Sequence, residues 1–193
     1  MKGELLTMTI TIQKLTDPTP EIAAVLEGWS NDPALVPFIR PSKDRQALEK
    51  KVSVTVETLQ ERLVHQTIYL ITWDDKLVGE MNFMVDPSHL HQKVPDTAWI
   101  GILIGDEEAR GRGIGTRAMQ HLEDEIRDAG LRRIELGVFE FNRGALQLYR
   151  KLGYQEIGRI PDFTYWQGRL WEDIRMEKWL QRRRAPDEGP DRE

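Results

Sequence analysis

The most distinct hydrophobic segment of the chain is residues 98–104, Ala-Trp-Ile-Gly-Ile-Leu-Ile, which is apolar at almost every position. A polar segment, 87–96, precedes it. A short and nearly continuous apolar run is typical of a strand that is covered on both faces of a sheet. We therefore predict that residues 98–104 form a central strand.

The segments before this run alternate between strand and helix periodicity. Asp17, Pro18 and Pro20 interrupt the first alternating stretch, and Trp73-Asp74-Asp75 separates two β-rich stretches as a hairpin turn does. In chain order we predict a strand at 8–14, a helix through Ile22, Val25 and Leu26, one or two amphipathic helices within 43–65, and a hairpin of strands 67–72 and 76–85.

The segments after the run alternate between helices that end at glycine and further strands. Apolar positions recur at helical spacing over 116–129, where Gly130 supplies the stop. Asn142 is a suitable N-cap for a second helix, which ends at Gly153. The remaining β-rich stretches predict strands at 133–138, 154–160 and 171–179.

This order of elements suits one globular α/β domain, and a length of 193 residues is enough to bury a sizeable core. We place the domain at residues 8–180, after a flexible N-terminal segment, 1–7. Residues 181–193 contain charges of both signs and two prolines without apolar periodicity, so we expect a disordered tail there.

Charge and composition exclude several classes of function. Lys and Arg number 27 against 32 Asp and Glu, a formal net charge of −5, so no overall basic field attracts nucleic acid or anionic lipid. The absence of Cys excludes disulfides, thiolate nucleophiles and Cys-bound metals. No apolar run reaches the roughly 18 residues of a membrane span, and the N-terminus lacks the apolar stretch of a signal peptide. We expect a cytoplasmic protein that binds neither nucleic acid nor membranes.

The most informative polar segment is 110–116, Arg-Gly-Arg-Gly-Ile-Gly-Thr, between the central strand and the helix that follows it. Glycine lets the backbone approach a ligand closely, and the unpaired amides of a first helical turn attract phosphate. Arginine side chains add to this preference. The segment predicts a phosphate-binding loop, and an ordinary glycine-rich connection is the alternative.

The spacing of its glycines separates this loop from two common nucleotide-binding motifs. A Walker loop needs Gly-Lys-Ser/Thr, whereas Gly115 is followed by Thr116 and Arg117. A dinucleotide fingerprint needs G-x-G-x-x-G, whereas this chain has G-x-G-x-G. A nucleotide-dependent transferase and a nicotinamide enzyme are therefore disfavoured.

Two segments match paired motifs of one enzyme superfamily. Residues 110–115, Arg-Gly-Arg-Gly-Ile-Gly, fit the pattern Arg/Gln-x-x-Gly-x-Gly/Ala, and residues 142–154 fit N-x-x-A-x-x-x-Y-x-x-x-G-F/Y. In both, the chain resembles the GNAT N-acetyltransferases, and most of all the ribosomal-protein and small-amine acetyltransferases. The resemblance covers residues 98–179. It implies a mixed, mostly antiparallel sheet with helices on both faces and a splayed central strand pair that admits coenzyme A.

The resemblance also implies acetyl-CoA as cosubstrate and assigns residues to it. The pyrophosphate is expected on the loop amides, namely those of Arg110, Gly111, Arg112, Gly113, Ile114, Gly115 and Thr116. The pantetheine arm is expected along the open backbone edge of Ile102, Leu103 and Ile104, with Asn142 beside it. Tyr149 corresponds to the tyrosine near the thioester sulfur, which we assign as general acid. A core aromatic is the alternative for Tyr149, since it falls on the apolar stripe of its helix.

The general base cannot be transferred from the family, because Trp99 stands where many relatives have an acidic residue. Glu80 and Asp96 are candidate substitutes, and deprotonation through ordered water is a third route. Trp99 itself is expected to shape the acceptor pocket together with Trp29 and Phe139, since an aromatic wall suits a cationic amine.

The resemblance implies acetyl transfer to a primary amine, on a small molecule or a peptide, by direct attack in a ternary complex. A catalytically silent acyl-CoA sensor or scaffold is the alternative. Relatives often dimerise, so a homodimer is a further expectation. His89-Leu90-His91 lacks a third ligand, and we expect no metal.

Overall fold

Strand β4 (Thr97–Ile104) lies at the centre of a seven-stranded sheet, as the apolar run predicts. The strand order is β1-β2-β3-β4-β5-β7-β6, and every neighbouring pair is antiparallel except the parallel pair β4–β5. The other strands are β1 (Ile10–Lys14), β2 (Thr67–Trp73), β3 (Lys76–Val85), β5 (Arg133–Phe139), β6 (Gln155–Trp166) and β7 (Arg169–Trp179).

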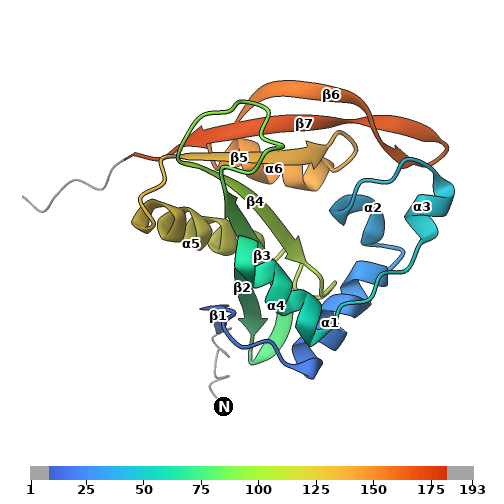
Figure 1. The fold of residues 1–193 in the computed structure, drawn as a ribbon, viewed down its shortest axis with the longest axis vertical. Coiled ribbons are helices and arrows are strands. Elements are labelled where there is room, and N and C mark those ends of the chain that lie inside the picture. Colours follow the sequence, from blue (N-terminus) through green and yellow to red (C-terminus); the bar gives the residue numbers. More distant parts are fainter. Residues whose placement is uncertain (1–8, 182–193) are drawn as a thin grey trace, which may run out of the picture.

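Helices cover both faces of this sheet in the computed structural model (Figure 1). They are α1 (Pro20–Asn31), α2 (Val36–Ile39), α3 (Arg45–Glu49), α4 (Val56–His65), α5 (Ile114–Asp128) and α6 (Arg143–Lys151). Successive side chains of a strand point to opposite faces. On β3, Met81 packs in the hydrophobic core together with residues of α5, whereas the preceding residue, Glu80, points the other way and contacts Arg62 of α4. Helices α5 and α4 therefore lie on opposite faces.

The predicted N-cap at Asn142 is confirmed, and the structure shows a further capped start at α4. The Asn142 side chain accepts a hydrogen bond from the Ala145 N–H at 3.3 Å and begins α6. The segment 43–65 forms two helices, and the second begins where Thr55 and Thr58 make a capping box.

The C-terminal hairpin is longer than the sequence pattern predicts. β6 continues past the predicted end at 160 to Trp166, and β7 begins at Arg169. The register of β6 shifts between Ile160 and Thr164, so its side chains lose strict alternation and the pattern of a strand is obscured there.

The structure describes residues 9–181. The predictions for residues 1–7 and for the tail from 181 onward concern residues outside this range, apart from Gln181, whose carbonyl accepts a hydrogen bond from Arg127 at 3.1 Å.

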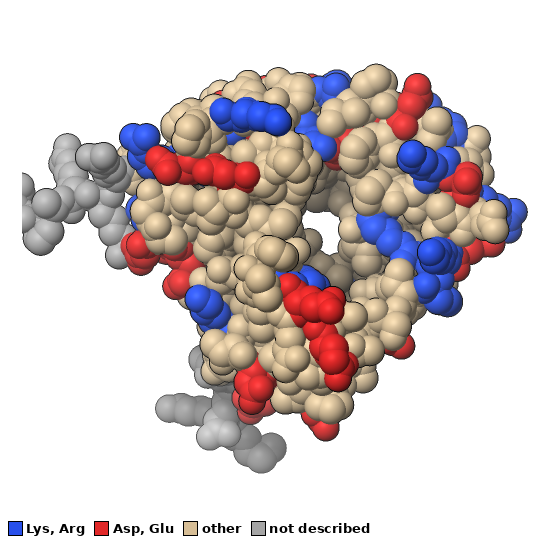
Figure 2. Space-filling view, in the orientation of Figure 1, with Lys and Arg blue, Asp and Glu red and all other residues tan. Residues whose placement is uncertain are grey.

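Strands β4 and β5 separate after three paired positions. The register pairs Thr97 with Arg133, Ala98 with Ile134 and Trp99 with Glu135, and no further pair follows. Residues 100–104 of β4 therefore have no neighbouring strand on the β5 side, which is the splay that the family resemblance implies. In the space-filling view an opening passes through the middle of the molecule in this region (Figure 2).

Candidate active site

The loop between β4 and α5 presents a row of unpaired amides. Within residues 9–181, the main-chain N–H groups from Gly111 to Thr116 donate no hydrogen bond, and the first paired amide is that of Arg117, which binds the Gly113 carbonyl at 3.1 Å. Gly113 is the N-cap of α5 in a left-handed conformation (φ 79°) without a side-chain cap. A left-handed residue at this point turns successive amides toward one side, and the helix terminus adds partial positive charge. The arrangement fits a diphosphate.

The two loop arginines are exposed, and their side chains bind main-chain carbonyls. Arg110 donates from Nε to the Ile104 carbonyl at 3.0 Å and from Nη2 to the Gly105 carbonyl at 2.8 Å. Arg112 donates from Nε to the Glu108 carbonyl at 2.6 Å, and its guanidinium lies 4.8 Å from the centre of the Trp73 ring. In this structure Arg110 therefore holds the loop to the end of β4, Arg112 binds within the loop and against β2, and the anion site consists of amides.

The amide of Arg110 does not belong to this row. It donates to the Glu107 carbonyl at 3.1 Å. The free amides therefore run from Gly111 to Thr116, one residue shorter than the predicted loop.

The backbone of β4 offers its open edge at alternate residues. The Thr97 carbonyl accepts from the Asp86 N–H, just after β3, and the Gly105 N–H donates to the Val78 carbonyl of β3, at 2.9 Å each. Because polar groups alternate between the two edges of a strand, Leu103 also faces β3, and Ile102 and Ile104 face the splay. The predicted edge of three residues is thus corrected to two, and Arg110 already occupies the carbonyl of Ile104.

Tyr149 lies on α6 among the core residues of the α5 face, and it is 7% exposed. Its hydroxyl makes no hydrogen bond to any residue of the described range. Burial raises the pKa of Tyr149 to about 12, so the phenol is protonated at neutral pH. The side chain is both a core aromatic and an available proton donor, and the two interpretations from sequence are compatible.

Of the two predicted base candidates, Glu80 lies near the splay. It pairs in register with Leu103 and is mostly buried. Both of its carboxylate oxygens are engaged by Arg62, at 2.7 and 3.4 Å. The carboxylate is therefore held in an ion pair with α4.

Asp96 is not brought to the site. It precedes β4 at the end where β4 and β5 are still paired, and Leu103 is about 20 Å away along the strand at roughly 3.3 Å per residue. The Asp96 side chain is half exposed and lies 3.6 Å from Arg132. It belongs to the closed end of the strand pair, on the outside of the molecule.

The predicted acceptor aromatics lie along the splay on the face opposite α5. The ring of Trp29 packs flat on Gly105, where an added Cβ would come within 2.1 Å of it. The far edge of Trp99 reaches across to Gly137 of β5, where it would lie 3.1 Å from an added Cβ. Phe139 stacks with Phe141 and Phe163, with ring centres 5.7 and 6.1 Å away. Trp29 and Phe139 thus lie toward the open end of the splay, and Trp99 lies at its closed end.

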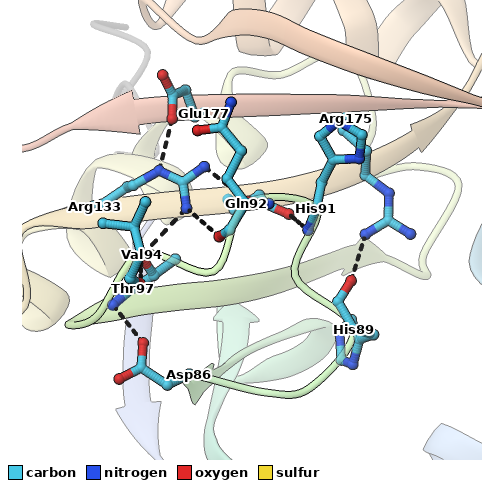
Figure 3. A network of polar contacts seen from close by, with 10 residues as sticks. Asp86, His89, His91, Gln92, Val94, Thr97, Arg133, Arg175 and Glu177 are labelled. Carbon is cyan, nitrogen blue, oxygen red and sulfur yellow. Dashed lines mark hydrogen bonds and ion pairs between the residues drawn. The ribbon is translucent and has the colours of Figure 1, made fainter.

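A buried polar network, which the sequence analysis missed, fixes the β3–β4 connection above β5 and β7 (Figure 3). Arg133 is fully buried and contacts Glu177 at 2.6 Å and Glu135 at 2.8 Å. Glu135 accepts hydrogen bonds from the main-chain N–H groups of His91 and Gln92, at 2.5 and 3.3 Å. The connection is thereby held against the face that carries Trp99.

The signal for this network is present in the sequence. Charged residues alternate on β5 at positions 133 and 135, and on β7 at 173, 175 and 177. Opposite charges at a period of two in neighbouring strands indicate cross-strand pairs on one face.

The sheet opens beside a loop of free amides, an α/β fold with an anion site at the mouth of a gap, and comparison with known proteins identifies the family. The model of the acetyltransferase (GNAT) family matches residues 29–154. The spermine/spermidine N(1)-acetyltransferase of Bacillus subtilis (strain 168) is 24% identical over 158 residues, which are 81% of this chain and 94% of that protein.

Two solved structures share the fold. A putative acetyltransferase from Salmonella typhimurium, solved with acetyl-CoA, has a TM-score of 0.68 and 17% identity, over 93% of this chain and 98% of the other. A spermidine N-acetyltransferase from Vibrio cholerae, in complex with CoA and spermine, has a TM-score of 0.67 and 19% identity, over 88% and 95% of the two chains.

The chain belongs to the acetyltransferase (GNAT) family. By this membership it belongs to a family of acetyltransferases. In residues 9–181, no cluster of three or more His, Asp or Glu side chains suits a metal ion. Among the same residues, no helix has the length and apolar character needed to span a membrane.

Proposed function

We propose that the protein transfers the acetyl group of acetyl-CoA to a primary amine by direct attack in a ternary complex. The row of free amides from Gly111 to Thr116, at the open end of the splay, is the observation that supports this most directly. It supplies a pyrophosphate site from which the pantetheine arm enters the gap beside Ile104 and Ile102.

The pantetheine arm then adds to β4 as a short extra strand. An extended ligand beside an unpaired strand edge gains main-chain hydrogen bonds whatever the neighbouring side chains are. Here the available groups are the N–H of Ile104 and both polar groups of Ile102. An arm that runs from the loop toward Trp99 places its thioester near the closed end of the splay.

The chemistry asks for alignment, an oxyanion donor and a proton for the leaving thiolate. Since Leu103 turns its amide to β3, the amide of Ile102 is the oxyanion donor that we assign. Tyr149 donates its phenolic proton to the sulfur as the C–S bond breaks. The acceptor amine approaches from the opposite face of the sheet, along Trp29, Trp99 and Phe139.

The proposed acceptor is a small-molecule or peptide amine. The named activity of the Bacillus relative on spermine and spermidine supports testing polyamines first, followed by amino acids and peptides that carry a free N-terminus. Specificity of this kind resides in the loops around the acceptor face.

The test is a screen of amines that follows the release of free coenzyme A thiol. We expect turnover with at least one primary amine, and a loss of about 100-fold or more in kcat for Tyr149→Phe, the usual size of a general-acid effect. Tyr154→Phe is the matched control, because its ring lies 5.7 Å from that of Tyr149 and is equally buried. Full activity of Tyr149→Phe would contradict the assignment, and acetyl-CoA binding without turnover on any amine would favour the sensor.

A further inference from the structure

A further buried carboxylate lies on the acceptor face, beyond the last paired position of β4 and β5. Asp173 of β7 is 2% exposed. Its two oxygens lie 2.7 and 3.0 Å from the position that a Cβ would occupy on Gly137. Any side chain at position 137 would therefore displace the carboxylate, and the bare glycine makes room for it.

The surroundings of Asp173 join it to the acceptor site. Gly137 is two residues beyond Glu135, which pairs with Trp99 at the last position where β4 and β5 are in register. The edge of the Trp99 ring reaches the same point, 3.1 Å from where a Cβ on Gly137 would lie. The side chains of Asp173 and Trp99 thus both reach Gly137 of β5, the strand that borders the gap. Strand β7, which carries Asp173, is one strand spacing of about 4.8 Å from β5.

One oxygen of Asp173 has no partner. Oδ2 lies 2.7 Å from Nε of Arg175, whereas Oδ1 accepts no hydrogen bond and makes no ion pair within the described range. By contrast, Arg62 engages both oxygens of Glu80. Oδ1 therefore keeps its full capacity to accept a hydrogen bond from a ligand group.

We propose that Asp173 is the general base of the acetyl transfer, through an acceptor ammonium that binds at its Oδ1. This inference rests on the proposed function. The ammonium gives one proton to Asp173, which later passes it to solvent. The nitrogen then attacks the thioester carbon, the C–S bond breaks, and the thiolate takes the proton of Tyr149. The second proton of the nitrogen restores the phenol, so one proton is released for each acetyl group transferred.

The charge around Asp173 supports the role. Burial raises the pKa of Asp173 to about 6, against the opposing effect of Arg175. The carboxylate is therefore ionised at neutral pH, yet it is a stronger base than an exposed aspartate. Other charged groups on this face are paired: Arg133 of β5 contacts Glu135 and Glu177, and Glu80 of β3 contacts Arg62.

His89 is the titratable side chain of the overlying connection that packs on Trp99. Its ring lies edge-on to Trp99 at 4.7 Å, and its carbonyl accepts a hydrogen bond from Arg175 at 3.3 Å. Burial, and then Arg175, lower the pKa of His89. The experiment must therefore separate these two groups.

The test compares pH profiles of kcat/KM for the wild type, Asp173→Asn and His89→Gln, with an amine that the wild type acetylates. We expect a wild-type acidic limb near pH 6, because protonation of Asp173 removes the base. Asp173→Asn should lower kcat/KM by about 100-fold or more and abolish that limb. His89→Gln should keep the limb.

Two further measurements keep the outcome decisive. Calorimetry with acetyl-CoA should give the same affinity for Asp173→Asn as for the wild type, which shows that the variant folds and that the cofactor site is intact. Arg175→Gln should move the acidic limb to higher pH, because it removes the cation that favours the ionised carboxylate. If Asp173 served only in packing, Arg175→Gln would not shift the acidic limb of the pH profile.

An acidic limb that persists in Asp173→Asn and disappears in His89→Gln would overturn the proposal while leaving acetyl transfer intact. A wild type that binds no acetyl-CoA would instead remove the proposed function itself.

Discussion

Gly113 is the residue on which the phosphate site depends most. Its φ of 79° starts α5 without a side chain that could fill the row of amides. Gly130 ends the same helix with φ 84°, and a Cβ added to either glycine would meet no heavy atom within 4 Å. Gly113 and Gly130 therefore share the left-handed conformation and the open space around a Cβ, but only Gly113 lies at the row of loop amides.

We predict that Gly113→Asp weakens acetyl-CoA binding by about 100-fold or more, and that Gly130→Asp leaves it unchanged. Both substitutions carry the same left-handed strain of about 1 to 2 kcal/mol. Only the first adds a carboxylate and its charge to the anion site. Calorimetry with acetyl-CoA measures both variants, and an equal effect of the two would show that strain alone is responsible.

At this scale the sequence identified the motif residues but not the directions of their side chains. The glycines, Asn142 and Tyr149 follow from spacing and resemblance. The carbonyl contacts of Arg110 and the orientation of Leu103 depend on strand register, which a single sequence does not reveal. In the sequence Asp173 is only one charged residue of an alternating strand. Its role is visible only when the fold places Gly137 and Trp99 beside it.

At the scale of elements, the important feature is that β4 and β5 pair over only three positions. A parallel pair that continued would bury the edge of β4 and leave no place for a pantetheine arm. The closed end is reinforced by Arg133, whose guanidinium bonds to the Thr97 hydroxyl and to the Gln92 carbonyl, at 3.3 Å each.

Thr97 tests how much this reinforcement contributes. It is fully buried, and its hydroxyl also donates to the Val94 carbonyl at 2.7 Å. Thr97→Val keeps the shape and removes both bonds, so we predict a loss of about 1 to 3 kcal/mol in the free energy of unfolding. Denaturant unfolding with an unchanged slope would measure it.

Thr72→Val is the control for this prediction. The Thr72 hydroxyl makes one long hydrogen bond, 3.5 Å, to the Thr11 carbonyl. We expect its effect to stay within about 0.5 kcal/mol. Equal losses for the two variants would argue against a special role of the buried network.

The sequence predicted most elements because their signals are local. The apolar run of β4, the cap of α6 and the turn of the β2–β3 hairpin each depend on neighbouring residues. The extension of β6 and the splay depend on contacts between distant segments, and the splay entered the prediction through family resemblance alone.

At the scale of the whole molecule, the domain separates two tasks on the two faces of one sheet. The amides of the loop and Tyr149 of α6 lie with the α5 face, where the cofactor is expected. Trp99, Glu80 and Asp173 lie on the other face, where the acceptor is expected. The gap between β4 and β5 is the passage through which the two substrates meet.

The most direct test of this account is calorimetric titration with acetyl-CoA, S-acetyl-4′-phosphopantetheine and S-acetylpantetheine. Two charge-assisted hydrogen bonds to phosphate contribute at least about 3 kcal/mol, which corresponds to roughly 100-fold in affinity. The account predicts saturable binding of acetyl-CoA and a loss of at least that size when the last phosphate is removed. Equal affinity for all three compounds, or no binding of acetyl-CoA, would contradict it.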